Sequence, residues 1–188
     1  MGLNLVIVSD THLPLRARTL PDQLWAALEA ADVVVHAGDW VSEAALDEFE
    51  ARCRRLVAVY GNNDGPHLRA RLPEIARVEL AGLRIAVVHE TGPAKNREAR
   101  CAAAFPDTDL LIFGHSHIPW DSTAPGGLRL INPGSPTDRR RQPFCTYLTA
   151  TLAGTPTGTV DDTAGTGLRD VVLHRLPPRP SSRSEGRR

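Results

Sequence analysis

The segment of residues 110–119 constrains the chain most. Its apolar run, residues 110–113, is followed by Gly114, then by His115 and His117 one residue apart, and finally by a proline. Four apolar residues that lead into turn-forming residues indicate a buried strand ending in a loop. Two imidazoles at a strand end are typical metal ligands, and their partners must come from elsewhere in the chain. We therefore look for other strands that end in Asp, Asn or His.

The first half of the chain repeats this pattern three times. Apolar runs at residues 3–8, 32–36 and 55–60 each lead into polar residues. The spacing of apolar residues between them predicts helices over Pro21–Ala30 and Ser42–Arg52, the second capped by its serine. Short strand–helix–strand connections imply right-handed crossovers and a parallel core, in which ligands bind beyond the carboxyl ends of the strands.

The second half alternates less regularly. A strand pair flanks Ala81-Gly82, a second pair lies within Trp120–Ile131, and one helix is expected over Asn96–Phe105. Residues 61–66 are rich in turn formers and are expected to form a loop. Two further strands are predicted near the end of the chain, over Phe144–Leu152 and Leu168–Leu176, joined by a Gly- and Thr-rich loop that contains Asp161 and Asp162.

Length and composition predict one soluble domain. The chain has 188 residues, and residues 1–176 are expected to form a single domain followed by a flexible, Pro-, Ser- and Arg-rich tail at 177–188. Its 22 basic and 22 acidic side chains cancel, so bulk charge gives no strong nucleic-acid signal. The first apolar run is far shorter than the roughly 20 residues of a membrane helix, and no signal-peptide pattern precedes it. We therefore expect a cytoplasmic protein with no membrane partner, and three free cysteines, since no C-x-x-C pair occurs.

The strand-end residues form a set of metal-type ligands. Carboxylate, amide and imidazole groups without thiolate suit Mn²⁺, Fe²⁺, Co²⁺, Ni²⁺ or Zn²⁺ better than Ca²⁺ or Mg²⁺. Seven ligands exceed what one such ion needs, and they suit two ions that share a bridging ligand. Two ions about 3.5–4 Å apart can clamp the attacking and leaving oxygens of a phosphoryl transfer. The seven residues are Asp10, His12, Asp39, Asn62, His89, His115 and His117.

The order of these residues resembles the motif pattern of the calcineurin-like metallophosphoesterases, and among them the small YfcE-type phosphodiesterases. The resemblance covers roughly residues 3–176, and Asn132-Pro-Gly-Ser135 is similar to a segment often seen after the last histidine of this subgroup. The family pattern D-x-H, G-D, G-N-x-[DE], H and G-H-x-H occurs in order as Asp10-Thr-His12, Gly38-Asp39, Gly61-Asn62-Asn63-Asp64, His89 and Gly114-His115-Ser-His117.

The resemblance implies an α/β fold, a four-layer α/β/β/α sandwich of two mixed sheets. It further implies two divalent ions, with Mn²⁺ the first choice, and a small phosphate-ester substrate attacked at phosphorus by a hydroxide held between the ions. Asp39, Asn62 and His115 would act in catalysis. The implied ligand sets are Asp10, His12 and His117 for the first ion and Asn62, His89 and His115 for the second, with Asp39 as the bridge.

Two positions depart from the family pattern. Asn63 stands where many members carry a histidine that protonates the leaving group, and an amide cannot act as a general acid. We therefore expect modest rates and a preference for good leaving groups. Glu90 follows His89 where glycine is common, and the sequence does not decide whether its carboxylate supports a metal ligand or points away. Trp40 and Trp120 are expected to pack near the mouth of the site.

Three functions remain open at this stage. The first is a two-metal phosphodiesterase acting on small organic phosphodiesters. The second is a protein-binding scaffold, since the same fold serves as a subunit of the retromer coat, where the metal site is incomplete. The third is a phosphomonoesterase or protein phosphatase, which the lack of an obvious substrate-gripping insertion disfavours. The physiological substrate, the native metal and a homo-oligomeric state cannot be read from the sequence.

Overall fold

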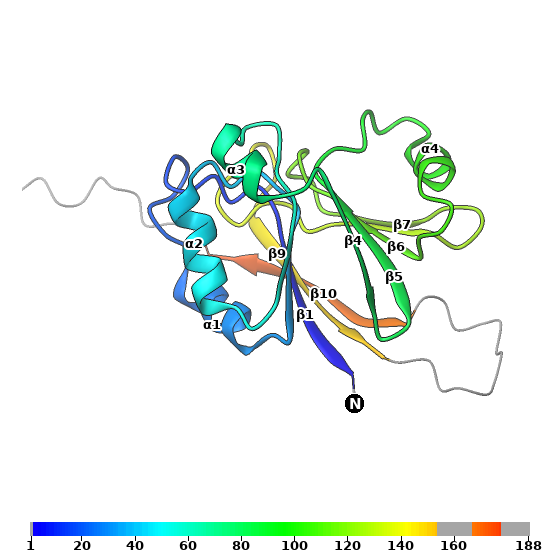
Figure 1. Cartoon of the computed structure of the whole chain (residues 1–188), viewed down its shortest axis with the longest axis horizontal. Helices are drawn as coiled ribbons and strands as arrows, with labels where there is room; N and C mark the ends of the chain where they lie inside the picture. Colours follow the sequence, from blue (N-terminus) through cyan, green and yellow to red (C-terminus); the bar gives the residue numbers. More distant parts are fainter. Residues whose placement is uncertain (1, 154–166, 178–188) are drawn as a thin grey trace, which may run out of the picture.

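Two five-stranded mixed sheets form the body of the molecule (Figure 1). The computed structural model describes residues 2–153 and 167–177. In the first sheet, with strand order β10-β9-β1-β2-β3, the strands β1, β2 and β3 are parallel, β9 is antiparallel to β1, and β10 is antiparallel to β9. These strands span Leu3–Val8 (β1), Val33–His36 (β2), Leu56–Ala58 (β3), Cys145–Leu152 (β9) and Leu168–Leu176 (β10).

The second sheet has the order β4-β5-β6-β8-β7, with a parallel centre of β5, β6 and β8 and an antiparallel strand at each edge. Its β4–β5 connection is the predicted hairpin, in which Ala81 and Gly82 both have positive φ, as a tight two-residue turn requires. Its strands span Ile75–Leu80 (β4), Leu83–Val88 (β5), Leu110–Ile112 (β6), Trp120–Thr123 (β7) and Arg129–Asn132 (β8).

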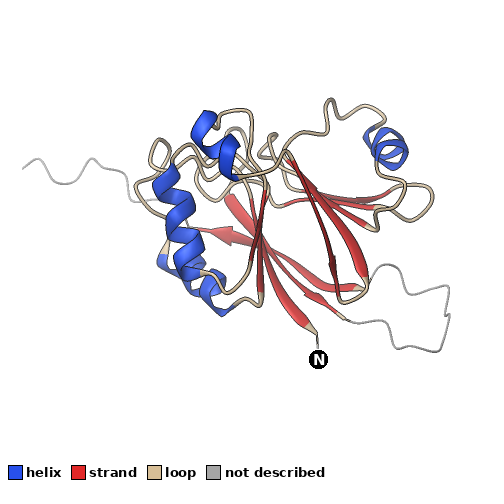
Figure 2. Ribbon diagram, viewed as in Figure 1, coloured by secondary structure: helices blue, strands red, loops and turns tan. Residues whose placement is uncertain are grey.

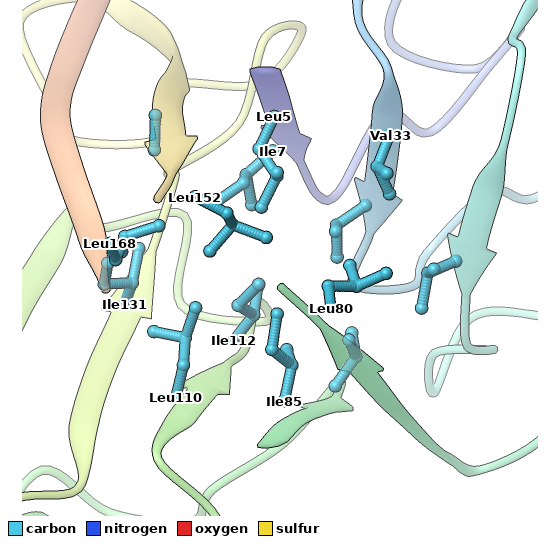
Figure 3. Packing of buried hydrophobic residues seen from close by; sticks show 14 of the residues in the cluster. Leu5, Ile7, Val33, Leu80, Ile85, Leu110, Ile112, Ile131, Leu152 and Leu168 are labelled. Carbon is cyan, nitrogen blue, oxygen red and sulfur yellow. The ribbon is translucent and has the colours of Figure 1, made fainter. Parts of the chain in front are cut away.

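The two sheets face each other across the main core. Figure 3 shows Leu5 and Ile7 of the first sheet pointing towards Ile85, Leu110 and Ile112 of the second, and all five are at most 2% exposed. Helices cover the outer faces, with α1 (Asp22–Ala30) and α2 (Glu43–Arg52) on the first sheet and α4 (Arg97–Ala104) on the second (Figure 2). The α/β/β/α layering expected from the resemblance is therefore confirmed.

The helices follow the sequence signals with one exception. The hydroxyl of Ser42 caps α2 by accepting a hydrogen bond from the backbone N–H of Ala45 at 3.2 Å, as predicted. The exception is α3 (Pro66–Arg71), which follows a run of turn formers and has only one buried residue, Leu68, so that the sequence gives no helical signal there. Proline occupies the first turn of this short helix, where its missing N–H costs nothing.

Some sequence predictions fall on other parts of the molecule. No disulfide joins the three cysteines; Cys101 is buried, and Cys53 and Cys145 are half-buried. Residues 154–166, with Asp161 and Asp162, and most of the predicted tail, residues 178–188, lie outside the described residues. In the described part of the chain, no helix is long and apolar enough to cross a membrane.

Trp40 is not at the mouth of the site, where the sequence predicts it, but fully buried. Its ring stacks on that of His36, and its Nε1–H donates a hydrogen bond to the carbonyl of Val59.

Candidate metal centre

All seven predicted ligand residues lie together, in the loops that follow five parallel strands. The loop after β1 carries Asp10 and His12, and the loops after β2, β3 and β5 carry Asp39, Asn62 and His89. The loop after β6 carries His115 and His117. Backbone hydrogen bonds join these loops, from Asp10 N to Gly38 O at 2.9 Å and from Gly114 N to His89 O at 3.0 Å. The site therefore spans the carboxyl ends of both sheets.

The first group of donor atoms comes from Asp10, His12 and His117. His117 Nε2 lies 3.2 Å from Asp10 Oδ1 and 3.2 Å from His12 Nε2. His12 Nε2 lies 3.9 Å from the same carboxylate oxygen. All three side chains are at most 7% exposed, so these polar atoms converge in a nearly closed space.

The second group comes from Asn62, His89 and His115. The side-chain oxygen of Asn62 lies 3.0 Å from His89 Nε2 and 2.9 Å from His115 Nδ1. Asp39 lies between the two groups, with Oδ2 3.6 Å from His12 Nε2 and Oδ1 3.4 Å from His89 Nε2. Each of its oxygens thus faces a different group, as a bridging ligand requires.

Five of the seven residues adopt left-handed backbone conformations. The φ angles are 56° at Asp10, 44° at His12, 62° at Asp39, 68° at His115 and 57° at His117. Each such residue costs of order 1–3 kcal/mol and is kept only where the surrounding structure enforces it. The loops are therefore shaped to aim these side chains inward.

Asp64 enforces this shape for two of the loops. Its buried carboxylate accepts hydrogen bonds from the backbone N–H groups of Asp39, Val41 and Gly61 at 3.1, 2.7 and 2.7 Å. Val41 itself has φ 79°, an outlier for a β-branched residue. In the sequence, only the position of Asp64 at the end of the G-N-x-[DE] motif points to this role.

Gly114 allows the two sheets to meet at the site. A Cβ atom at this position would collide with Ser9 Oγ and would lie 2.8 Å from Asp10 Oδ2 and 3.0 Å from the carbonyl of Ala37. The backbone of Gly114 therefore approaches the first strand closely because it has no side chain, and the N–H of His115 donates to Asp10 Oδ2 at 3.0 Å.

Backbone carbonyls fix the tautomers of two histidines. His89 Nδ1 lies 2.7 Å from the carbonyl of Ala37, and His117 Nδ1 lies 2.6 Å from the carbonyl of Asp138. Because a carbonyl only accepts, each Nδ1 carries the hydrogen, and in the neutral ring Nε2 keeps its lone pair. The hydrogen-bearing Nδ1 of both rings thus points away from the site, and Nε2 faces it.

The resulting atoms fit cations. Asp10 Oδ1 is buried without a hydrogen-bond partner, although it faces the Nε2 lone pair of His117. A buried cluster of acceptors facing acceptors is unfavourable unless protons or metal ions lie between them. Nitrogen and oxygen donors without thiolate are a set suited to divalent transition metals. The residues present therefore fit the ions that the motifs imply.

The site also shifts the pKa values of its members. Burial works against ionisation of Asp39, but hydrogen bonds and the charge of His89, together with two bonds from Asn63, hold its pKa well below the usual range. Burial lowers the pKa of His89, yet Asp39 and Asp10 outweigh it and raise that pKa to about 9. Burial lowers the pKa of His12. The two carboxylates therefore favour a positive charge at His89.

The two residues that depart from the family pattern both touch the centre. The Asn63 side chain donates to Asp39 Oδ2 at 2.6 Å, and its backbone N–H donates to Oδ1 at 2.9 Å. Glu90 Oε1 lies 3.7 Å from His115 Nδ1.

A cavity of about 420 Å³ opens beside Asn62 and His89. Trp120 does not line this cavity.

Comparison with known proteins agrees with this geometry. Residues 3–155 match the protein family described as the calcineurin-like phosphoesterase superfamily domain. The chain belongs to this superfamily. A probable metallophosphoesterase of Methanothermobacter thermautotrophicus is 32% identical over 133 residues, which cover 70% of this chain and 76% of that protein. Membership implies divalent metal ions, for which the structure offers the candidate ligand groups described above.

Two more distant relatives extend the comparison. A phosphodiesterase of Methanocaldococcus jannaschii is 28% identical over 178 residues, covering 89% of this chain and 97% of that protein. The crystal structure of Vps29 from Chaetomium thermophilum superposes with a TM-score of 0.71 at 18% identity, over 94% of this chain and 96% of that one. The second similarity shows the fold alone.

Proposed function

We propose that this phosphoesterase-family protein hydrolyses small organic phosphodiesters with two divalent metal ions, Mn²⁺ being the first choice. The observation that carries the proposal is the convergence of all seven ligand-competent side chains, with Asp39 between two groups of three. A chain that had lost catalysis would be free to lose any of them. When bound, such a pair of ions supplies a nucleophile at neutral pH and neutralises charge on the phosphate.

The chain's own residues would divide the work as follows. Asp10, His12 and His117 would hold the first ion, Asn62, His89 and His115 would hold the second, and Asp39 would serve both. The carbonyls of Ala37 and Asp138 keep the rings of His89 and His117 in the ligating orientation. Asp39 stays ionised because its pKa lies well below the usual range. The protein thereby presents a rigid arrangement in which little covalent chemistry is required of it.

Three observations bear on the ester that is cleaved. Asn63 hydrogen-bonds Asp39 and offers no acidic proton, so leaving groups that need little protonation are favoured. The cavity beside Asn62 and His89 has room for an organic group on the phosphate. The M. jannaschii relative is named a phosphodiesterase, which supports the same assignment.

The test compares hydrolysis of bis-p-nitrophenyl phosphate and p-nitrophenyl phosphate by chelator-stripped protein. The assay is run without metal and with Mn²⁺, Ni²⁺ or Zn²⁺. Metal-restored turnover of the diester well above that of the monoester is expected. Turnover of the monoester alone would move the assignment to a phosphomonoesterase.

A protein-binding scaffold is the second candidate. The fold matches that of Vps29, and the edge strand β10 exposes two apolar side chains, Val172 at 47% and Leu173 at 40%. A folded protein that turns over neither ester with any of these metals would favour this function. The intact set of seven donors argues for the enzyme.

A further inference from the structure

Glu90 adds a carboxylate to the second group of donor atoms. It directly follows His89 at the end of β5, and its Oε1 lies 3.7 Å from His115 Nδ1. The ligand atoms of His89, Glu90 and His115 lie within 4.8 Å of one another. This spacing would allow one ion to contact all three side chains.

No other described residue engages this carboxylate. Among residues 2–153 and 167–177, Glu90 has no hydrogen bond, and His115 is its only ion-pair partner. Arg69, which lines the same cavity, directs its Nε and Nη2 groups to the carbonyls of Asp64, Gly61 and Asn62. Arg69 therefore braces the loop of Asn62 and does not neutralise Glu90.

The two groups of donors differ in charge without Glu90. The first group contains the carboxylate of Asp10, whereas Asn62, His89 and His115 are neutral when they ligate a metal. Asp39 faces both groups and does not distinguish them. Glu90 gives the second group a carboxylate of its own. Hard and borderline divalent ions bind more tightly where the ligands carry more negative charge.

We propose that Glu90 is a direct carboxylate ligand of the second metal ion, completing the set of Asn62, His89, His115 and the shared Asp39. This inference rests on the two-ion centre of the proposed function. The second ion is thereby held more tightly than the neutral ligands alone would hold it. Three carboxylates leave two divalent ions with a smaller excess of positive charge than two carboxylates would. The centre still attracts a singly charged diester, but its preference for a doubly charged monoester is weaker.

The test measures metal binding and not turnover. Chelator-stripped wild-type protein is titrated with Mn²⁺ against a fluorescent chelator, and bound metal is counted by elemental analysis after dialysis. Glu90→Gln removes the charge at nearly constant shape. Glu74→Gln is the matched control, since Glu74 lines the same cavity but belongs to none of the candidate metal-binding groups. Both side chains are exposed, and thermal unfolding of the metal-free variants verifies that the fold is intact.

Wild-type protein is expected to bind two ions per chain. Glu90→Gln should keep the first ion and weaken the second by about 10- to 100-fold, while Glu74→Gln should match the wild type. An unchanged second affinity in Glu90→Gln, an equal loss in both variants, or a single ion in the wild type would each overturn the assignment. A different outcome is two-ion binding that depends on Glu90 in a protein that hydrolyses neither ester. This result would refute the proposed function but would support Glu90 as a metal ligand.

Discussion

Removing the Asp64 carboxylate should loosen both the fold and the metal centre. In the variant Asp64→Ala, the backbone N–H groups of Asp39, Val41 and Gly61 lose their shared acceptor inside the protein. Each unpaired buried donor costs about 1–3 kcal/mol. Since water can reach part of the vacated space, we expect a loss of about 3–6 kcal/mol in the free energy of unfolding.

The variant Asp64→Asn separates the hydrogen bonds from the charge. An amide oxygen at the position of Oδ2 keeps the bonds from Asp39 and Gly61 and loses the one from Val41. Burial raises the pKa of Asp64, and the backbone bonds only partly offset it, so the neutral amide also avoids a desolvation cost. The expected loss is therefore only about 1–2 kcal/mol.

Urea unfolding of the metal-free proteins measures both losses, and Mn²⁺ titration measures the effect on the centre. Asp64→Ala should bind Mn²⁺ more weakly, because the left-handed conformation of Asp39 loses its support. A loss below about 1 kcal/mol in Asp64→Ala, together with wild-type Mn²⁺ affinity, would refute the reasoning.

Three further predictions follow from the site. Asp39→Asn keeps the shape but removes the shared charge, so metal-dependent turnover should fall at least about 100-fold. The circular dichroism spectrum should remain that of a folded protein, while the unfolding midpoint falls modestly because one of the two hydrogen bonds from Asn63 loses its acceptor; full activity would contradict the assignment. Asn63→His should raise turnover of esters with poor leaving groups more than that of p-nitrophenyl esters, measured as a ratio of kcat/KM values, and an unchanged ratio would mean that protons come from elsewhere. With a pKa of about 9, His89 should be protonated at pH 7 in the metal-free protein. Mn²⁺ binding should therefore release about one proton, and the affinity for Mn²⁺ should increase as pH rises towards 9. Calorimetry in buffers of different ionisation enthalpy measures this release, and zero release would show that His89 is neutral before binding.

Sequence reasoning reached the order of strands and helices in the first half because its signals are local there. Alternating apolar runs, the Ser42 cap and the turn at Ala81-Gly82 depend on neighbouring residues only. The pairing of β1 with β9, more than 130 residues later in the chain, carries no local signal, and the sandwich was expected from the family resemblance alone. The short helix α3 was missed because only Leu68 in it is buried, which leaves no apolar periodicity to read.

The candidate site was reachable as a set of residues but not as a geometry. Strand-end positions indicated all seven candidate ligands, because parallel strands bring their carboxyl ends to one edge. Two features of the site depend on contacts between loops, which only the folded chain displays. They are the left-handed backbone at Asp10 and His12 and the hydrogen bonds that the Asp64 carboxylate accepts. For the same reason, the direction of Glu90 and the burial of Trp40 could not be predicted.

The most direct test of the account titrates Mn²⁺ into chelator-stripped protein and follows hydrolysis of bis-p-nitrophenyl phosphate at each addition, with His117→Ala in parallel. The account predicts that turnover rises with occupancy of the second ion, levels off at two ions per chain, and is lost in the variant, which lacks a donor of the first group. Turnover that is complete at one ion, that survives in His117→Ala, or that fails to develop at any Mn²⁺ concentration would contradict it.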